Sequence, residues 1–330
     1  MNKSLTLVAV LLTVLTAASV ASATENKTLC VFDPSGAHGD IFKFAKSYQT
    51  AALGWGVRFK LKAQTNEVVA TSDFKAKKCD AVLLTSLRAR KFVRTTGSIE
   101  AIGALPSYSM LKTVIRVLAS PKAAKLVTTK KGFETVGILP GGAVYLLLRD
   151  RRANSMAKLS GKRIATLIHD KPARVMVDVV GASMVPAEVG TFAGIFNNGR
   201  ADACYAPATA VKPLELTKGM KRGGGIVKFP IAQLTFQVIT RTASMPAGFG
   251  QQSRKWVASQ FKAGLAMAKK AERAIPGRYW ISANASETMG YHAKFAEVRE
   301  RLRKKGVYSS TMLKLMNRIR CRKDKSLPGC

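Results

Sequence analysis

The sequence has few histidines, and the patterns of common catalytic motifs are missing from it. Its three histidines are His38, His169 and His292, and none has the spacing of a metal ligand. No serine stands in a nucleophile elbow, and Gly223-Gly224-Gly225 lacks the lysine of a phosphate-binding loop. No pattern pairs the carboxylates for acid–base work. The sequence therefore predicts a protein that is not an enzyme and holds neither a metal nor a cofactor.

A long apolar run occurs only at the start of the chain, where the residues have the three parts of a secretory signal peptide. Met1-Asn2-Lys3 carries a positive charge, and an uncharged run rich in Leu, Val and Ala extends from Leu5 to Val20. Ala21-Ser22-Ala23 then offers the small residues that signal peptidase accepts. A membrane anchor is the alternative, but the run is short for a span of ~20 residues. We expect cleavage after Ala23 and a soluble periplasmic product.

Acidic residues are scarce as well. Nineteen Asp and Glu face 54 Lys and Arg, which gives a formal net charge of +35 at pH 7. Such a charge would suggest nucleic acid in the cytoplasm, but export removes that partner in most settings, so we expect none. Two interpretations stay open: a solvated basic surface, or an anionic partner such as a membrane surface or polysaccharide. The basic residues are densest from Arg299 to Lys325.

Strand and helix patterns alternate along the chain, which is typical of parallel α/β sheets. A first set has expected strands over 28–32, 57–62 and 81–84 and helices over 39–53 and 67–75. A second set has strands over 162–168 and 183–185 and helices over 173–180 and 188–196. The remainder, after about residue 240, is mainly helical.

Two long strand-like segments suggest a division into two lobes. One covers 135–148 and contains Pro140-Gly141-Gly142, and the other covers 226–240 and contains Pro230. We expect both to cross between the lobes. Residues 24–140 and 231–330 would form lobe I with the C-terminal helices, and residues 141–230 would form lobe II. A short echo supports related lobes, because Phe74–Ala81 and Phe196–Ala203 place Phe, Asp and Ala at identical spacing.

Four segments resemble the solute-binding proteins of TRAP transporters, a group in the periplasmic-binding-protein class. They are Leu159–Ile164, Val180–Pro186, Phe192–Asp202 and Phe74–Asp80. The resemblance implies an α/β fold of the periplasmic binding protein-like type (type II, TRAP-type), with two lobes joined by crossing strands. It also implies a monomer that captures a small-molecule solute in the cleft between its lobes for a membrane transporter.

Three further segments, Val31–Gly36, Lys212–Leu216 and Phe229–Leu234, are similar to a narrower group of solute-binding proteins. Some members carry a label as drug-efflux components, which does not fit an exported chain without many membrane spans. Ala165 stands where TRAP-type proteins usually have the arginine that clamps a carboxylate. An organic-acid ligand therefore stays open, and the candidates to replace that arginine are Arg88, Arg149 and Arg151.

Ligands of open α/β sheets bind beyond the carboxyl ends of the strands, and that rule selects the candidate ligand-binding residues. They are Asp33, Ser35, Asn66, Glu67, Thr85, Ser86 and Arg88 in the first lobe, Gly142 and Tyr145 at the first crossing, and Asp170, Glu188 and Tyr205 in the second lobe. Tyr205 also matches the place of a contact residue in TRAP-type proteins. Each has a structural alternative: Asp33 could fix a turn, Glu67 could favour a helix N-terminus, the tyrosines could be core residues, and Arg88 could be a surface charge.

The arrangement of strands in this class also suggests how the five cysteines pair. Cys30 and Cys79 would lie at one end of neighbouring parallel strands, within disulfide reach. Cys321 and Cys330 bracket a short tail and could tie it down. Cys204 is then free and buried in a strand.

Two hypotheses for the function remain. The first is a receptor that closes over one solute and gains stability from it. The second is an envelope-associated protein whose basic surface engages anionic lipid or polysaccharide. The second predicts binding to anionic vesicles that is lost as salt rises.

Overall fold

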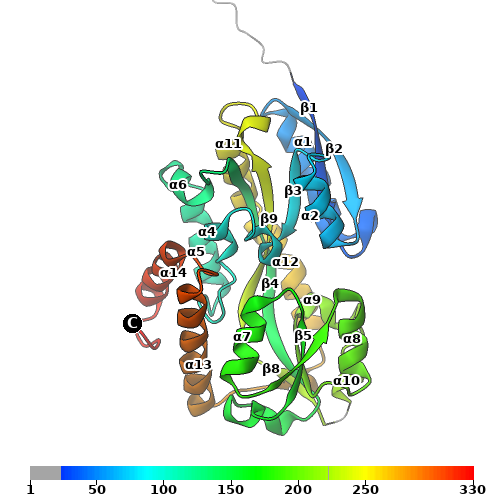
Figure 1. Ribbon diagram of the computed structural model, residues 1–330, viewed down its shortest axis with the longest axis vertical. Coiled ribbons are helices and arrows are strands. Elements are labelled where there is room, and N and C mark those ends of the chain that lie inside the picture. Colours follow the sequence, from blue (N-terminus) through cyan, green and yellow to red (C-terminus); the bar gives the residue numbers. More distant parts are fainter. Residues whose placement is uncertain (1–23, 222) are drawn as a thin grey trace, which may run out of the picture.

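One mixed sheet connects two α/β lobes (Figure 1). The computed structural model describes residues 24–221 and 223–330, so the signal peptide predicted over 1–23 and its cleavage site lie outside the described residues. Within those residues, no helix is both long enough and apolar enough to cross a membrane. The strand order is β2-β1-β3-β9-β4-β7-β5-β6, with β8 and β10 attached through β4.

The elements of the first lobe and of the crossing agree with the expected alternation. They are β1 (Glu25–Phe32), α1 (Asp40–Leu53), β2 (Val57–Gln64), α2 (Glu67–Lys75), β3 (Ala81–Thr85), α3 (Ser86–Ala89), α4 (Arg94–Gly97), α5 (Tyr108–Leu118), α6 (Ala124–Val127), β4 (Phe133–Leu148) and β9 (Ala232–Arg241). The amphipathic helix α5 has no counterpart among the expected elements.

The elements of the second lobe also alternate as expected, and the C-terminal part is mainly helical. Their elements are β5 (Arg163–Leu167), α7 (Lys171–Val179), β6 (Ser183–Ala187), α8 (Val189–Asn197), β7 (Ala203–Pro207), α9 (Ala208–Val211), α10 (Thr217–Met220), β8 (Gly225–Val227), α11 (Phe249–Ser259), α12 (Phe261–Ala274), β10 (Trp280–Ile281), α13 (Ala285–Lys304) and α14 (Ser310–Lys323). The segment expected over 226–240 is thus two strands, because Pro230 lies in the break between β8 and β9.

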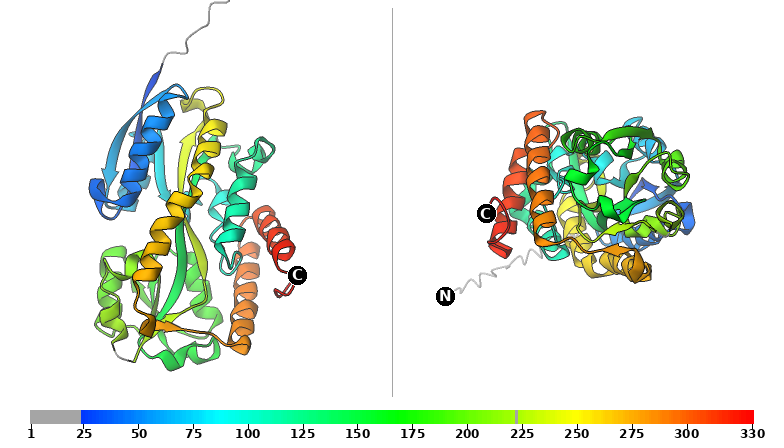
Figure 2. Two further views of the ribbon diagram at one scale, coloured as in Figure 1. Left: turned by 180° about the vertical axis from the view of Figure 1, so that it is seen from behind. Right: turned by 90° about the horizontal axis from the view of Figure 1, so that it is seen from below.

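Strands β4 and β9 form the crossing between the lobes (Figure 1). The two are antiparallel from Phe133 to Val144, with register shifts at 135–137 and 140–142. The first half of β4 pairs with β9, and the other edge of β9 pairs with β3. The second half of β4 pairs with β7. Helices α11 and α12 run along this crossing from one lobe to the other (Figure 2). Strands and helices together therefore form the connection between the lobes.

The sequence echo corresponds to one structural unit present in both lobes. Phe74 and Phe196 lie near the ends of α2 and α8, and each is fully buried. Three residues further on, Lys77 and Gly199 have φ of 60° and 79°, the left-handed conformation that commonly follows a helix. The two helices therefore end in the same way.

The aspartates of the echo start equivalent strands. The Asp80 carboxylate accepts a hydrogen bond from the Thr28 amide at 2.8 Å, and the Asp202 carboxylate accepts one from the Arg163 amide at 2.9 Å. In return, the Asp80 and Asp202 amides donate to the carbonyls of Thr28 and Arg163. Each aspartate thereby joins the start of its own strand, β3 or β7, to the neighbouring strand, β1 or β5.

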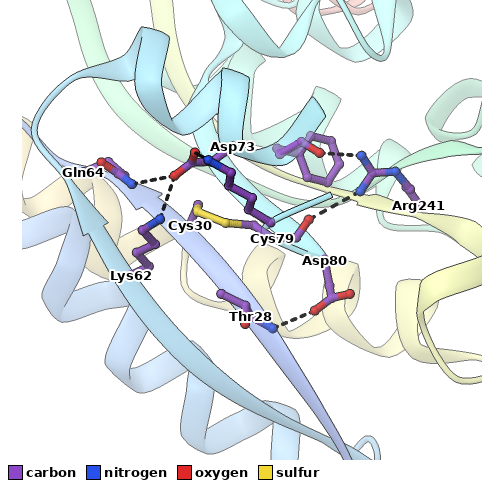
Figure 3. The surroundings of a disulfide bond; sticks show 10 residues. Thr28, Cys30, Lys62, Gln64, Asp73, Cys79, Asp80 and Arg241 are labelled. Carbon is purple, nitrogen blue, oxygen red and sulfur yellow. Dashed lines mark hydrogen bonds and ion pairs between the residues drawn. A yellow bond between two sulfur atoms is a disulfide. The ribbon is translucent and has the colours of Figure 1, made fainter. Parts of the chain in front are cut away.

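Both expected disulfides are confirmed. Cys30 and Cys79 are bonded, with 5.9 Å between their Cα atoms, and both are buried between β1 and α2 (Figure 3). Asp73 lies beside them and accepts hydrogen bonds from Lys62 at 2.7 Å and Gln64 at 3.0 Å. The second disulfide, Cys321–Cys330, ties the C-terminal tail to α14. Cys204 is free and buried, as expected.

The C-terminal helices contact both lobes. Helix α13 packs against α7 of the second lobe, and α14 packs against α5 of the first (Figure 1). Apolar side chains of these helices face the core, since Val257, Phe261, Met312 and Met316 are all buried. The exact boundaries expected for the lobes stay a prediction.

Candidate ligand-binding cleft

A cavity of about 290 Å³ lies between the two lobes. Lobe I and the crossing contribute the carboxyl end of β3, the start of α2 and the start of β9. Lobe II contributes the carboxyl ends of β5 and β7 and one side of α7 and α8. Most of the wall is apolar, with side chains that include those of Leu146, Ile164, Met176, Phe192 and Leu234. The polar members are Glu67, Thr85, Glu100, His169, Asp170, Tyr205 and Tyr308.

Glu67 is the first residue of α2 and is only 8% exposed. Its Oε1 accepts hydrogen bonds from the Thr85 amide at 2.7 Å and the Thr85 hydroxyl at 2.6 Å. Its Oε2 lies 3.6 Å from Nε of Arg88, which is also buried. Burial raises the pKa of Glu67 to about 7, because desolvation outweighs these stabilising partners.

Glu100 is the second acid of the wall. Its Oε2 accepts a hydrogen bond from the Ser86 hydroxyl at 2.5 Å, and its Oε1 lies 3.4 Å from Nη1 of Arg90. Burial raises its pKa to about 7, with Arg90 and Ser86 opposing the shift. Near neutral pH, Glu67 and Glu100 are therefore both partly protonated. We refer to them as the cavity glutamates.

The polar groups of lobe II follow the carboxyl end of β5. Asp170 caps α7, since its Oδ1 accepts from the Ala173 amide at 3.0 Å. Its Oδ2 accepts from the Tyr205 hydroxyl at 3.0 Å, and that hydroxyl accepts from the Leu167 amide. Burial raises the pKa of Asp170. Burial, with Arg88 and Lys91 nearby, lowers the pKa of His169 to about 4, so this imidazole is neutral at pH 7.

Four of the twelve candidate residues line this cavity: Glu67, Thr85, Asp170 and Tyr205. Two more, Ser86 and Arg88, contact the cavity glutamates from outside the lining. The strand-end rule thus selects residues at the carboxyl ends of β3, β5 and β7 that do converge. Ligand contact for each of them stays a prediction.

Four other candidates serve at helix starts and turns away from the cavity. Asp33 accepts hydrogen bonds from the amides of Ile41 and Phe42 at the start of α1, and from that of Ser35. Asn66 caps α2. Glu188 is exposed at the start of α8, where it forms a capping box.

Gly142 and Tyr145 lie on β4 at the crossing, outside the cavity lining. The Tyr145 hydroxyl donates to Glu272 of α12 at 2.9 Å, and the Tyr108 hydroxyl of α5 donates to the same carboxylate. The Ala143 amide donates to Tyr108 at 2.9 Å. These groups bind α5 and α12 to the crossing strand.

Two candidate substitutes for the clamp arginine, Arg149 and Arg151, donate to backbone carbonyls outside the cavity lining, whereas Arg88 lies directly behind the lining residue Glu67. Ala165 is fully buried within β5. Arg149 donates to the carbonyls of Phe196 and Gly219, and Arg151 donates to that of Arg278. Among the described residues, the cavity lining contains neither lysine nor arginine.

Sequence reasoning did not select Glu100, His169 and Tyr308 for the cavity. His169 directly follows the strand predicted over 162–168, so the strand-end rule could have included it. Glu100 lies after the short helix α4 and Tyr308 lies between α13 and α14, and neither follows a strand. They reach the cavity only through the packing of the helical parts, for which the sequence has no signal.

The family model for the solute-binding proteins AdeT 1/2 matches residues 50–330. The chain is 38% identical over 300 residues to the probable solute-binding protein AdeT1 of Acinetobacter baumannii, covering 91% of this chain and 98% of that protein. The structure is similar to a TRAP periplasmic solute-binding protein of Ralstonia eutropha H16 with bound (S)-2-acetolactate, with a TM-score of 0.68 and 12% identity over 90% of this chain and 99% of that one.

A second structure, the open ligand-free TRAP periplasmic solute-binding protein of Escherichia fergusonii, matches with a TM-score of 0.66 and 20% identity, covering 89% of this chain and 99% of that one. These likenesses confirm the expected two-lobed fold. Family, fold and inter-lobe cavity agree on a protein that binds a solute. The chain belongs to the AdeT 1/2 family of solute-binding proteins.

Proposed function

We propose that this chain is an exported receptor that closes over one small solute at the cavity between its lobes and delivers it to a membrane transporter. The observation that carries the proposal is the convergence of both lobes on one mainly apolar cavity with a few polar groups, the usual form of a small-molecule site. The proposal includes removal of the signal peptide after Ala23 and a role without catalysis.

Closure would be a hinge motion about the crossing. The antiparallel pair β4 and β9 and the helix α12 connect the lobes, and β4 shifts register between Pro140 and Gly142. Changes of backbone angle at a few such positions can rotate one lobe toward the other. The strand ends that carry Thr85 and Asp170 would then approach a solute from opposite sides.

The experiment is a thermal-shift screen of the mature protein against a library of chemically diverse metabolites. A bound solute raises the melting temperature by mass action. Ala210 lines the cavity, so Ala210→Trp should fill it and abolish the shift. Ala76, exposed at the end of α2, gives the matched control Ala76→Trp, which should keep the shift. Absence of any stabilising solute, or a shift that Ala210→Trp leaves intact, would contradict the proposal.

A second role is supported by the basic groove between α13 and α14. Its exposed basic residues are Arg303, Lys314 and Arg318, and Glu300 of the same lining pairs with Arg303. We infer that this groove attracts the anionic surface of a membrane, because basic side chains near such a surface each contribute about 1 kcal/mol of attraction. Co-sedimentation with phosphatidylglycerol vesicles should occur at low salt and be lost at high salt. Equal sedimentation with neutral vesicles would contradict this role.

A further inference from the structure

The described lining of the cavity contains acidic side chains and no lysine or arginine, in contrast to the strongly basic composition of the chain. Although the formal net charge of the chain is +35, the ionisable lining residues are Glu67, Glu100, Asp170, His169 and the tyrosines. The imidazole of His169 is neutral at pH 7. No side chain of the described lining therefore offers a permanent positive charge, and three offer carboxylates.

The three carboxylates are not equivalent. Glu67 lies near Arg88 and Glu100 lies near Arg90, so an arginine behind the wall faces each of these two. Asp170 forms no salt bridge within the described residues, and the more distant Arg90 only partly offsets the rise of its pKa that burial causes. Each of its oxygens accepts one hydrogen bond, from the Ala173 amide or the Tyr205 hydroxyl, and a carboxylate oxygen can accept another. Asp170 is thus the acid best able to take a new cationic partner.

Aromatic rings line the same cavity, and one of them, Tyr308, already has the Arg90 guanidinium 5.5 Å from its ring centre. Phe32, Phe192, Tyr205, Phe295 and Tyr308 all line the cavity. The faces of aromatic rings attract organic cations, and desolvation strengthens that attraction. The rest of the wall is aliphatic, which favours an apolar body. Carboxylates, aromatic rings and aliphatic walls in one cavity are complementary to an amphipathic ammonium compound.

We propose that the cleft selects hydrophobic organic cations, such as alkyl- or arylalkylamines, with Asp170 as the counter-ion and the apolar wall as the seat of the hydrophobic body. This inference rests on the proposed role as a solute receptor and names its ligand class. An organic acid would bring a negative charge into a wall of carboxylates. Arg88 and Arg90 already face the cavity glutamates, and neither lines the cavity.

The test uses three probes with one apolar body and different head groups: 4-phenylbutylammonium, 4-phenylbutan-1-ol and 4-phenylbutanoate. Titration calorimetry on the mature protein at pH 7.5 should give the highest affinity for the amine and the lowest for the acid. A hydrogen bond to a charged group is strong enough that Asp170→Asn should weaken amine binding by about 10- to 100-fold. The same variant should leave the alcohol within a few-fold.

The control is Asp178→Asn, which makes the same change of charge on the exposed side of the same helix, α7. It should bind the amine like the unchanged protein. Asparagine caps helices about as well as aspartate, so Asp170→Asn should remain folded, and its circular dichroism spectrum checks this.

Each outcome decides one of the two proposals. Tighter binding of 4-phenylbutanoate than of the amine would overturn the ligand class and leave the receptor role intact. The ligand class would also be overturned if Asp170→Asn bound the amine with unchanged affinity, or if all three probes failed to bind while another library solute stabilised the chain. Failure of every library solute would overturn the receptor role, and the ligand class with it.

Discussion

Gly142 lies at a close approach of α12 to the crossing strand, so Gly142→Ala should destabilise the protein. Its φ of 107° is a conformation that other residues rarely adopt, and a Cβ there would lie 2.8 Å from the Cβ of Ala268. Backbone strain of this kind costs on the order of 1–2 kcal/mol. Overpacking of a core adds about 1–3 kcal/mol. We therefore expect the free energy of unfolding to fall by about 2–5 kcal/mol.

Urea denaturation followed by circular dichroism, with both disulfides intact, measures this loss. The matched control is Gly290→Ala in α13, where an added Cβ meets no atom within 4 Å. Alanine is the better helix former, so the control should gain about 0.5–1 kcal/mol. Replacing glycine by alanine is thus expected to lower the free energy of unfolding at residue 142 and to raise it at residue 290.

The steric part of the loss has its own test. Combining Gly142→Ala with Ala268→Gly removes the close contact and should recover part of the stability, giving a coupling of at least about 1 kcal/mol in a double-mutant cycle. The reasoning is refuted if Gly142→Ala unfolds at the same urea concentration as the unchanged protein, or if the two substitutions are simply additive.

Three further predictions concern the disulfides and the cavity. Replacing the two cysteines of one disulfide by serine should lower the free energy of unfolding by about 4 kcal/mol for Cys30–Cys79 and about 3 kcal/mol for Cys321–Cys330, because the first disulfide closes the longer loop. A larger loss for Cys321–Cys330 in urea denaturation would contradict this. Burial raises the pKa of both cavity glutamates to about 7, so lowering the pH from 8 to 6 protonates them and should weaken 4-phenylbutylammonium binding by roughly tenfold; calorimetric affinities that are equal at both pH values would exclude a role for their charge. The basic exterior repels a cation, so raising NaCl should increase the association rate of this probe several-fold in stopped-flow fluorescence, and a rate that falls with salt would contradict that repulsion.

Much of the fold could be predicted because its elements have strong local signals. Three such signals depend only on neighbouring residues. They are the apolar run of the strand at 81–84, the glycines that end the helix after Leu53, and the spacing of Phe74 and Asp80. These local features need no knowledge of how distant segments pack. The pairing of Cys30 with Cys79 needs in addition the order of neighbouring strands, which the resemblance to TRAP-type solute-binding proteins implies.

The site was harder to predict because a residue after a strand can have two roles. Asp33 and Asp170 both follow strands, but Asp33 directs its carboxylate to the amides of α1 while Asp170 lines the cavity. Glu100 reaches the cavity through the packing of segments distant in sequence. Which strand end meets the cleft is decided by tertiary packing, and no local pattern encodes it.

The unit that occurs in both lobes carries a covalent bond in only one of them. Thr28 and Asp80 correspond to Arg163 and Asp202, so Cys30 and Cys79 correspond to Ala165 and Ala201, which are equally buried. One copy is crosslinked where the other has two buried alanines. Local unfolding should therefore begin in the second lobe, and its amides should exchange with solvent sooner than those of the first. Reducing agents would remove this asymmetry, so the difference in exchange between the lobes measures the redox state of the protein.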